Sequence, residues 1–398
     1  MEQIDRLPAF YLSHLTESIL PFWLTHGTDR TCGGYVTCLD EQGAVYDWDK
    51  LCMWAQGRLA WTFGRMYNEL ERRDEWLEFA RTGVTFIREH GFADDGTMYY
   101  ALARAGRPLQ PTQDVYTELS TILAFAEFAR ATGDAALAEQ TVELMDTIWN
   151  RLQTPGNAFQ PLAPDGQPTR LHGHSMITLN VLQELRRCFP EGDWNAKIDS
   201  CLETMLGRHL KRDRQVLFEL VDWHTGDQIP GWQGRWVNPG HMIEGGTFVI
   251  HEGLHRKDQT LIDDGISLIE WGFACGWDDE FGGIYNDIDV DGAPIPTAAA
   301  LLADSKIWWQ HAEALYGLLL AYTVSGRREF LDNYWLTHHY TTSHFIPREG
   351  GEWHCSLDRR GNVICAAKGT ARKNAFHVAR NCLLCIQLLA DAPSGHKS

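Results

Sequence analysis

Apolar residues recur at helical spacing along most of the chain. In residues 51–70, 74–91 and 118–133, apolar side chains occupy positions i, i+3, i+4 and i+7, which is the spacing of an amphipathic helix. The short sequences ATGD (131–134) and VSGR (324–327) separate successive helical segments. Because turns this short connect antiparallel helices, the pattern predicts a chain built mainly of helical hairpins.

Six short segments that resemble one another interrupt this helical pattern. Each has an aromatic residue, alternating residues and a glycine-containing turn, which is the signature of a short β-hairpin. They begin about 60 residues apart, so two helices fit between consecutive segments. We therefore predict an all-α fold, an (α/α)6 barrel of twelve helices whose loops carry short β-hairpins that gather at one end and build the pocket. No linker or shift in composition divides residues 1–398, and we expect a single domain. The six segments span residues 33–46, 95–109, 157–169, 215–229, 282–295 and 351–364.

Charge and composition narrow the functional classes. The net charge of −18 argues against a nucleic-acid partner, because no basic stripe exists to neutralise phosphates. No apolar run is long enough for a membrane span, and residues 1–20 carry acids throughout, unlike a signal peptide. The ten cysteines are scattered, which favours a reduced, cytoplasmic protein. The 16 tryptophans suit a ligand with sugar rings, although aromatic residues also fill large cores.

Three motifs resemble metal-binding or redox sites, but the residues around each of them argue against such a site. HEGLH (251–255) matches the zinc-protease pattern HExxH, but Glu270 is only a weak candidate for the third ligand. DIDVDG (287–292) copies the start of a calcium loop, yet Ala298 stands where the bidentate acid is required. The CxxC of Cys382 and Cys385 lies in an apolar helical stretch, which favours core thiols. We expect no metal at any of these places.

Polar residues recur at the start of the helix that follows five of the six hairpin segments. A lone histidine is usually an ordinary surface or core residue, but the repeated position favours a shared pocket. The residues at this point of the repeat are His172 and His174, His241 and Glu244, His377, Arg58, and the segment KIWWQHAEAL (306–315).

Five motifs between residues 33 and 380 share the order and composition of one enzyme family. They are GGY…D…G…YD (33–47), WAQGRLAWTF (54–63), NPGHMIE (238–244), KIWWQHAEAL (306–315) and FHVAR (376–380). With these motifs the chain resembles the N-acylglucosamine 2-epimerase family, which also contains cellobiose 2-epimerases, mannose 2-epimerases and aldose–ketose isomerases. The resemblance covers essentially the whole chain and implies an (α/α)6 barrel that acts on a small-molecule sugar as an isomerase.

The resemblance also assigns roles to residues. It implies that His241 and His377 are the catalytic histidines, that Arg58 is the active-site arginine, and that Glu244 and Glu313 support the imidazoles. Inversion at C2 of an open-chain aldose requires one base to remove the proton and an acid on the opposite face to return one. Imidazole suits both roles near neutral pH, and a guanidinium stabilises the enediolate between the two steps. This chemistry requires no metal and no cofactor.

Further residues at the same helix ends are expected to contact the sugar. Tryptophans supply a stacking wall, and His174 stands where enzymes acting on unsubstituted sugars carry a histidine, whereas NPGHMIE is closer to the N-acyl and mannose branches. The lysine-free loop 153–169 argues against nucleotide activation. The expected substrate-binding residues are His174, Trp54, Trp308, Trp309, Glu118 and Arg380.

Three other functions stay open at this stage. An aldose–ketose isomerase would use the same site and return the proton to C1. An inverting glycosidase needs two opposed carboxylates, for which Asp114, Glu118 and Asp304 are available. The third alternative is a non-catalytic binding protein. Family members occur as monomers and homodimers, and we expect one of these two states.

Overall fold

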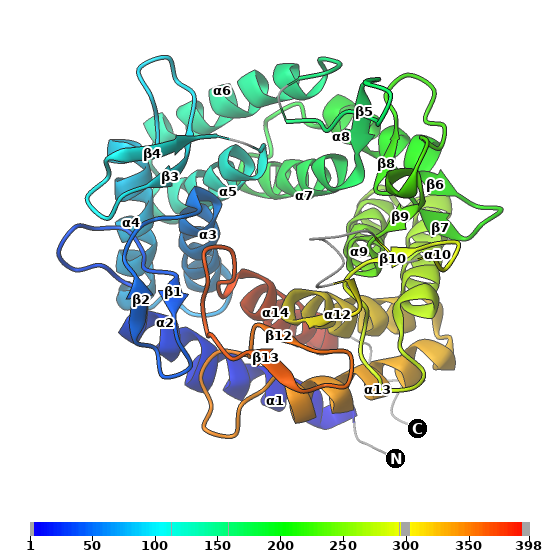
Figure 1. Ribbon diagram of the computed structural model, residues 1–398. Helices are drawn as coiled ribbons and strands as arrows, with labels where there is room; N and C mark the ends of the chain where they lie inside the picture. The colour runs from blue at the N-terminus through cyan, green and yellow to red at the C-terminus, as the bar shows by residue number, and fades with distance from the viewer. Residues whose placement is uncertain (1–3, 113, 158, 294, 296–302, 392–398) are drawn as a thin grey trace.

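A computed structural model describes residues 4–391 except 113, 158, 294 and 296–302. The described residues are mostly helical, which confirms the helical character expected from the periodicity. Seen end-on, the longer helices form two concentric rings (Figure 1). The inner ring consists of α3 (Met53–Glu69), α5 (Tyr116–Thr132), α7 (His172–Cys188), α9 (Pro239–Arg256), α12 (Trp308–Ser325) and α14 (Phe376–Asp391).

The outer ring covers the inner one, with one helical segment behind each inner helix (Figure 1). The first outer segment is helical from residue 4 to residue 26 and includes the 3-10 helix η1 (Ile4–Arg6) and the π-helix η2 (His14–Ile19). A second π-helix, η3 (Glu203–His209), and a 3-10 helix, η4 (Trp232–Arg235), follow in the middle of the chain. The outer helices are α1 (Leu7–Ser13) with α2 (Leu20–His26), α4 (Asp74–His90), α6 (Ala135–Leu152), α8 (Asn195–Leu202), α10 (Gln259–Gly276) and α13 (Arg328–His344).

Contacts between neighbouring inner helices close the ring. Each inner helix packs against the next in sequence, from α3 through α5, α7, α9 and α12 to α14, and α14 packs in turn against α3. The burial of the helices follows from this position. In α5 every residue from 117 to 129 is buried, whereas α4 exposes one face, because an inner helix is enclosed on all sides and an outer helix on one.

Short turns produce the alternation between inner and outer helices. α5 ends at Gly133, whose φ of 73° is the left-handed conformation of a helix C-cap. The next residue, Asp134, caps α6 by accepting a hydrogen bond from the Leu137 backbone N–H. The chain therefore reverses within two residues, as the ATGD sequence predicts.

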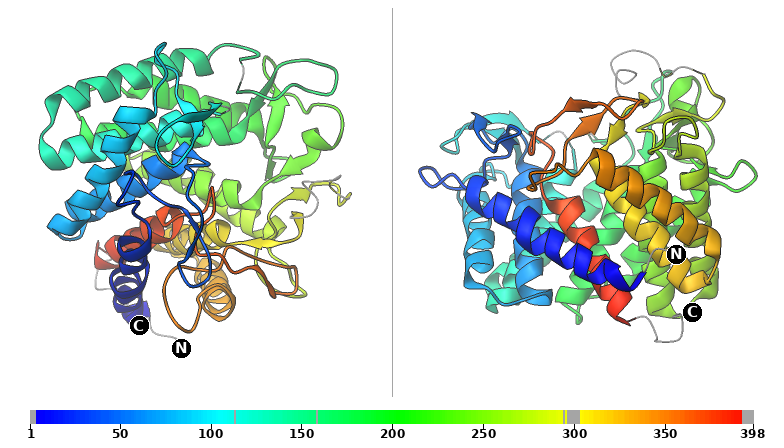
Figure 2. Two further views of the ribbon diagram at one scale, coloured as in Figure 1. Left: turned by 60° about the vertical axis from the view of Figure 1, so that its left-hand side comes forward. Right: turned by 90° about the horizontal axis from the view of Figure 1, so that it is seen from below.

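Short strands gather at one end of the rings, at the top of the right-hand view of Figure 2. Each inner helix follows such a strand or its connecting loop, so the N-terminal ends of the inner helices face this end. The strands are β1 (Cys38–Leu39), β2 (Val45–Asp47), β3 (Tyr99–Leu102), β4 (Pro108–Pro111), β5 (Thr169–Leu171), β6 (Leu210–Lys211), β7 (Val216–Leu217), β8 (Leu220–Asp222), β9 (Trp236–Val237), β10 (Ile288–Asp289), β11 (Lys306–Ile307), β12 (Ser356–Leu357) and β13 (Val363–Cys365).

The strand pairing differs in part from the six local hairpins that the sequence predicts. Local antiparallel pairs form between β1 and β2, β3 and β4, β6 and β7, and β12 and β13. By contrast β5 pairs with β8, β10 with β9, and β11 with β12, so these pairs join successive units. A strand of two or three residues has few local hydrogen bonds to offer, and the neighbouring unit supplies the rest. Residues 157–169 also close locally, through an antiparallel bridge between Leu162 and Pro168, so the pairs between units add to the local turns that the sequence predicts.

The apolar core lies between the two rings. One cluster of buried residues includes Trp23, Phe63 and Phe330, and a second includes Leu179, Val249 and Leu268. Cys382 and Cys385 are buried in the first cluster, as expected of core thiols. Within the described ranges, no helix has the length and apolar character that a membrane crossing requires.

Candidate active site

His241 lies at the start of α9, where local sequence fixes the backbone. The Asn238 side chain accepts a hydrogen bond from the His241 backbone N–H at 2.9 Å, and Pro239 occupies the first helical turn. A Cβ on Gly240 would lie 2.4 Å from Gln310 of α12, so glycine permits the two inner helices to approach here. The NPGH sequence therefore sets both the start of α9 and its distance from α12.

A buried carboxylate that the sequence analysis missed holds His241. Nδ1 of His241 lies 3.0 Å from Oε1 of Glu219, and Glu219 is fully buried. Burial alone would lower the pKa of His241, but the charge and hydrogen bond of Glu219, with Glu244 and Asp287 nearby, raise the pKa to about 8. His241 is therefore mainly an imidazolium at neutral pH.

The strand pairing between units places Glu219. β8 begins one residue after Glu219 and pairs with β5, and the Glu219 carbonyl accepts the His172 backbone N–H at 2.8 Å. Glu219 is therefore fixed beside the start of α7 and faces α9. The expectation that Glu244 would hold His241 was wrong in this respect, since the hydrogen bond to Nδ1 goes to Glu219.

His377 lies at the start of α14 and has different neighbours. Its Nδ1 lies 2.6 Å from Oε1 of Glu313 on α12, as the sequence analysis expected. Its Nε2 lies 3.2 Å from Nη1 of Arg58 on α3. A guanidinium can only donate, so Nε2 accepts and Nδ1 carries the proton. Burial lowers the pKa of His377 well below its usual value, and the charge of Arg58 adds to this effect against that of Glu244. His377 is therefore a neutral imidazole.

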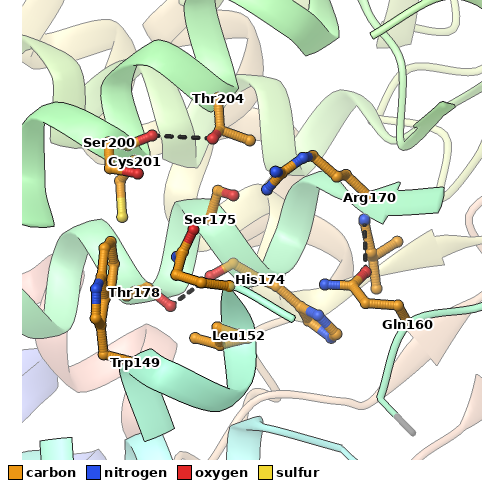
Figure 3. A pocket seen from close by; sticks show the side chains of 12 residues that line it. Trp149, Leu152, Gln160, Arg170, His174, Ser175, Thr178, Ser200, Cys201 and Thr204 are labelled. Carbon is orange, nitrogen blue, oxygen red and sulfur yellow. Dashed lines mark hydrogen bonds between the residues drawn. The ribbon is translucent and has the colours of Figure 1, made fainter. Parts of the chain in front are cut away.

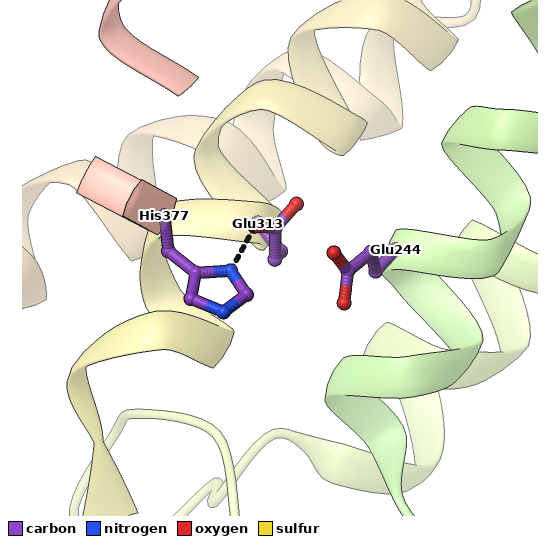
Figure 4. Close-up of side chains that lie close together, drawn as sticks. All are labelled: Glu244, Glu313 and His377. Carbon is purple, nitrogen blue, oxygen red and sulfur yellow. Dashed lines mark hydrogen bonds and ion pairs between the residues drawn. The ribbon is translucent and has the colours of Figure 1, made fainter. Parts of the chain in front are cut away.

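Arg380 connects Glu244 and Glu313, one turn further along α14. Nη2 of Arg380 lies 2.7 Å from Oε1 of Glu244 and 2.6 Å from Oε1 of Glu313. Figure 4 shows Glu244 and Glu313 facing each other beside the His377 ring, and their ligand atoms lie within 4.8 Å of one another. A metal ion could use such a set of atoms, but here a guanidinium supplies the positive charge between the two carboxylates. Arg380, expected to contact substrate, thus takes part in the charge network of the site.

Trp309 lies between the two histidines. Its ring centroid is 5.2 Å from that of His241 and 5.5 Å from that of His377. Trp54 lies at the Arg58 side of the site, with the guanidinium 5.0 Å from its ring. Trp308 packs against the hydrophobic core, with the Lys373 ammonium 5.5 Å from its ring. Of the tryptophans expected to stack on a sugar, Trp309 and Trp54 therefore lie with the catalytic candidates and Trp308 does not.

His174 lies outside this group and lines a pocket between α6, α7 and α8. Figure 3 shows its ring among side chains that include Gln160 and Arg170. The ring is nearly fully buried, and burial lowers its pKa to about 4. The His174 ring contacts the ring of Tyr116, with 5.6 Å between the ring centroids. The expected direct contact of His174 with the sugar stays a prediction.

Glu118 was also expected at the substrate, and its environment is different. Its Oε1 accepts a hydrogen bond from Arg151 at 2.5 Å. Arg151 belongs to the outer helix α6, so this buried pair joins an inner helix to an outer one. Asp114, named as a second carboxylate for a glycosidase, caps α5 by accepting the backbone N–H groups of Tyr116 and Thr117. Each carboxylate thus has one oxygen in a structural contact, Glu118 with the outer helix and Asp114 with the start of α5.

The zinc-like motif is engaged in other contacts. Nε2 of His251 lies 2.6 Å from the Tyr316 hydroxyl. Glu252 accepts hydrogen bonds from Arg186 and Arg256. His255 is exposed to solvent. The three side chains thus do not converge. Ala298 of the calcium-like segment lies outside the described residues.

Comparisons with known proteins agree with the fold and the motifs. The family model described as N-acylglucosamine 2-epimerase (GlcNAc 2-epimerase) matches residues 34–380. The N-acylglucosamine 2-epimerase of Mus musculus is 33% identical over 390 residues, covering 94% of this chain and 90% of that protein.

Two solved structures have the same architecture at lower identity. The cellobiose 2-epimerase of Bacillus thermoamylovorans superimposes with a TM-score of 0.83 at 20% identity, covering 96% of this chain and 99% of the other. A D-mannose isomerase superimposes with a TM-score of 0.81 at 18% identity, covering 97% and 99%.

These matches define an enzyme of the isomerase class, a carbohydrate epimerase of the racemase and epimerase group. The chain belongs to the N-acylglucosamine 2-epimerase family. Both the family resemblance and the enzyme class expected from the sequence are confirmed.

Proposed function

We propose that this enzyme interconverts gluco- and manno-configured aldoses by removing and returning the proton at C2, with His241 and His377 as the two proton-transfer groups. The observation that carries the proposal is the pair of imidazoles on either side of Trp309, each with Nδ1 bonded to a buried carboxylate. The carboxylates fix the two rings through Nδ1, so proton transfer falls to the Nε2 atoms. For His377 this requires the Arg58 guanidinium, which donates to Nε2 at 3.2 Å, to turn toward a substrate oxygen. Two such groups on different walls can address opposite faces of one carbon.

The different environments of the two histidines suggest a division of work. His377 is neutral and has a lone pair on Nε2, so it is the base for one direction of the reaction. His241, with its raised pKa of about 8, is the acid that returns a proton to the opposite face. In the reverse direction the roles exchange, because each histidine then begins in the state that the forward reaction left.

Arg58 is proposed to stabilise the enediolate intermediate. Its Nη1 lies 3.2 Å from Nε2 of His377. A sugar whose C2 proton is removed by His377 would therefore have this carbon next to a fixed positive charge. Its Nε is buried and has no protein partner among the described side chains, so a substrate oxygen could accept a hydrogen bond there. A guanidinium held in a buried site stabilises developing negative charge better than a solvated one.

The substrate that we propose first is the N-acetylglucosamine and N-acetylmannosamine pair, because the relative at 33% identity is named for N-acylglucosamine. Unsubstituted glucose and mannose are the second pair. The closed ring of inner helices supports a single (α/α)6-barrel catalytic domain, with the sugar entering from the strand end.

Incubation with each sugar in D2O tests the proposal. Deuterium should appear at C2 of both epimers, as observed by NMR. No exchange with N-acetylmannosamine, mannose, glucose or cellobiose would refute it. The D-mannose isomerase neighbour keeps an aldose–ketose isomerase as the second candidate. A ketose product in the same spectra would identify that reaction instead.

A further inference from the structure

Cys355 and Cys365 lie on neighbouring segments of the β12–β13 pair (Figure 1). Cys365 ends β13, and Cys355 stands directly before β12. The Cys355 backbone N–H donates to the Cys365 carbonyl at 2.9 Å. Residues joined in this way across antiparallel strands have Cα atoms about 5.5 Å apart, within the range of about 4.4–6.8 Å that a disulfide spans. Both cysteines are partly exposed and carry free thiols.

The two thiols differ in how readily they lose a proton. The Cys355 S–H donates a hydrogen bond to the Cys365 sulfur. Together with the Ala367 backbone N–H and the charge of Lys373, and against the effect of burial, this hydrogen bond lowers the pKa of Cys365 to about 6. The same hydrogen bond and burial raise the pKa of Cys355. Cys365 is therefore mainly a thiolate at neutral pH, with a protonated thiol held next to it.

This pair differs from the cysteines that fill the core. Cys382 and Cys385 are buried, and burial raises the pKa of both thiols, which makes such thiols inert. Cys365 is partly exposed and ionised, and it has a second thiol within reach. These are the properties of a cysteine that reacts with a hydroperoxide and is then resolved by its neighbour.

We propose that Cys365 and Cys355 form an oxidation site that takes a hydroperoxide and closes into a reversible disulfide. The Cys365 thiolate attacks one oxygen of hydrogen peroxide and the O–O bond breaks, which leaves a sulfenic acid and a hydroxide that is protonated to water. The Cys355 sulfur then bonds to the sulfenic sulfur, the S–O bond breaks, and the Cys355 proton leaves with the oxygen as a second water. The two thiols thus give up two electrons to the peroxide. A thiol such as glutathione reduces the disulfide again.

The site is connected to the start of α12. The Cys355 carbonyl accepts the Trp308 backbone N–H at 3.3 Å, and β12 pairs with β11, which leads directly into α12. Trp309 and Glu313 of the proposed active site lie in the first two turns of this helix. Closing the disulfide replaces a hydrogen bond between the sulfurs by a covalent bond, so it draws Cys355 toward β13. We expect the displacement to reach Trp309 and to weaken sugar binding, a consequence that rests on the proposed function.

Mass spectrometry of the purified protein after brief treatment with hydrogen peroxide tests the oxidation. The chain should lose about 2 Da, the mass of two hydrogen atoms, and glutathione should restore the original mass. Trypsin cuts after Arg359 and Arg360, so the disulfide should join peptides 349–359 and 361–368. No bond between these peptides, or a bond from either to another cysteine, would overturn the proposal. The measurement does not depend on turnover, so its failure is distinguishable from failure of the proposed epimerase function.

Three variants separate the steps. Cys355→Ser keeps a hydroxyl that can donate to the thiolate, and peroxide should leave a sulfenic acid on Cys365 that dimedone captures. Cys365→Ser should form neither product. Cys32→Ser is the matched control, because Cys32 is also partly exposed, and it should form the disulfide as the wild type does. Loss of the disulfide in this control, or no dimedone adduct in Cys355→Ser, would contradict the proposed order of steps.

The effect on the active site has its own readout. Oxidation of the wild type should raise KM for the sugar about 2–10-fold, the size of a weakened stacking contact, and glutathione should reverse the change. The KM of Cys365→Ser should not respond to peroxide. An unchanged KM in fully disulfide-linked protein would refute the connection to α12.

Discussion

The two halves of the proposed active site each pair a histidine with a glutamate, and the two histidines have opposite shifts in pKa. On one side Glu219 and Glu244 surround His241 and raise its pKa to about 8. On the other side Glu313 holds His377, but Glu313 is shared with Arg380 and Asn381, and Arg58 stands at the far nitrogen. The carboxylate there is already neutralised, so burial and the arginines keep His377 uncharged. The protonation state of a histidine next to a glutamate therefore depends on which other groups the glutamate contacts.

Removing either histidine should have the largest effect. We expect His241→Asn and His377→Asn each to lower kcat by roughly 10²–10⁴-fold, the contribution of a positioned acid or base. NMR of the epimer mixture measures the rate.

The same two variants test whether the histidines act on opposite faces. In D2O each variant should still exchange the C2 proton of one epimer, because the remaining histidine can remove and return a proton on its own face. The two variants should exchange different epimers. Exchange of the same epimer by both variants would contradict the opposed arrangement.

Removing the carboxylate partners should have an intermediate effect. Glu219→Gln and Glu313→Gln are each expected to lower kcat/KM by about 10–100-fold, as is usual for groups that orient a functional imidazole. Glu219→Gln should also move the high-pH decline of kcat/KM, set by His241 near pH 8, to lower pH, since it removes the charge that raises this pKa. Glu313→Gln should leave that decline in place.

Glu118→Gln is the matched control for these variants, because Glu118 is equally buried but paired with Arg151. Its pH profile should have the wild-type shape. A decline that stays in place in Glu219→Gln would show that another group sets it.

The two histidines should also have opposite effects on the pH dependence of the unfolding free energy, and these effects should be smaller than those on catalysis. His241 has a pKa of about 8 in the folded protein and 6.5 as its ordinary value. Its contribution to stability is therefore fully present below pH 6.5 and is lost as the pH rises through 8, a change of about 2 kcal/mol. The pKa of His377 is shifted downward, so its contribution is present above pH 6.5 and is lost as the pH falls.

Urea denaturation of the wild type and of His241→Asn measures this contribution. The difference in unfolding free energy between them should shrink from pH 6.5 to above pH 8. A difference that is independent of pH would mean that His241 does not gain a proton on folding.

The smallest effect is expected at the residue between the halves. Trp309→Phe keeps an aromatic ring between the histidines but reduces the stacking area, and KM should rise about 2–10-fold. Trp308→Phe is the neighbouring control and should leave KM unchanged, because Trp308 packs against the core. Equal effects of the two changes would argue against Trp309 as the stacking surface.

Local sequence accounts for a large part of the helical fold. Residues 51–70, 74–91 and 118–133 were predicted as helices, and α3, α4 and α5 begin and end within two residues of those limits. Periodicity, glycine caps and short turns act within a few residues of each other, so a sequence displays them directly. The strand pairs between units could not be predicted in this way, because a strand of two or three residues has no pattern that names its partner.

The sequence by itself determined that His241 and His377 begin inner helices and that Glu313 lies one turn into α12, since caps and helical spacing set those positions. Only the tertiary structure decided which carboxylate each imidazole contacts. Glu219 reaches His241 through the β5–β8 pair, and Glu244 is held by Arg380, which lies 136 residues away in the chain. Charge interactions and burial depend on distances in space between residues that are far apart in the chain. The protonation state of each histidine therefore follows from the tertiary structure and not from the sequence alone.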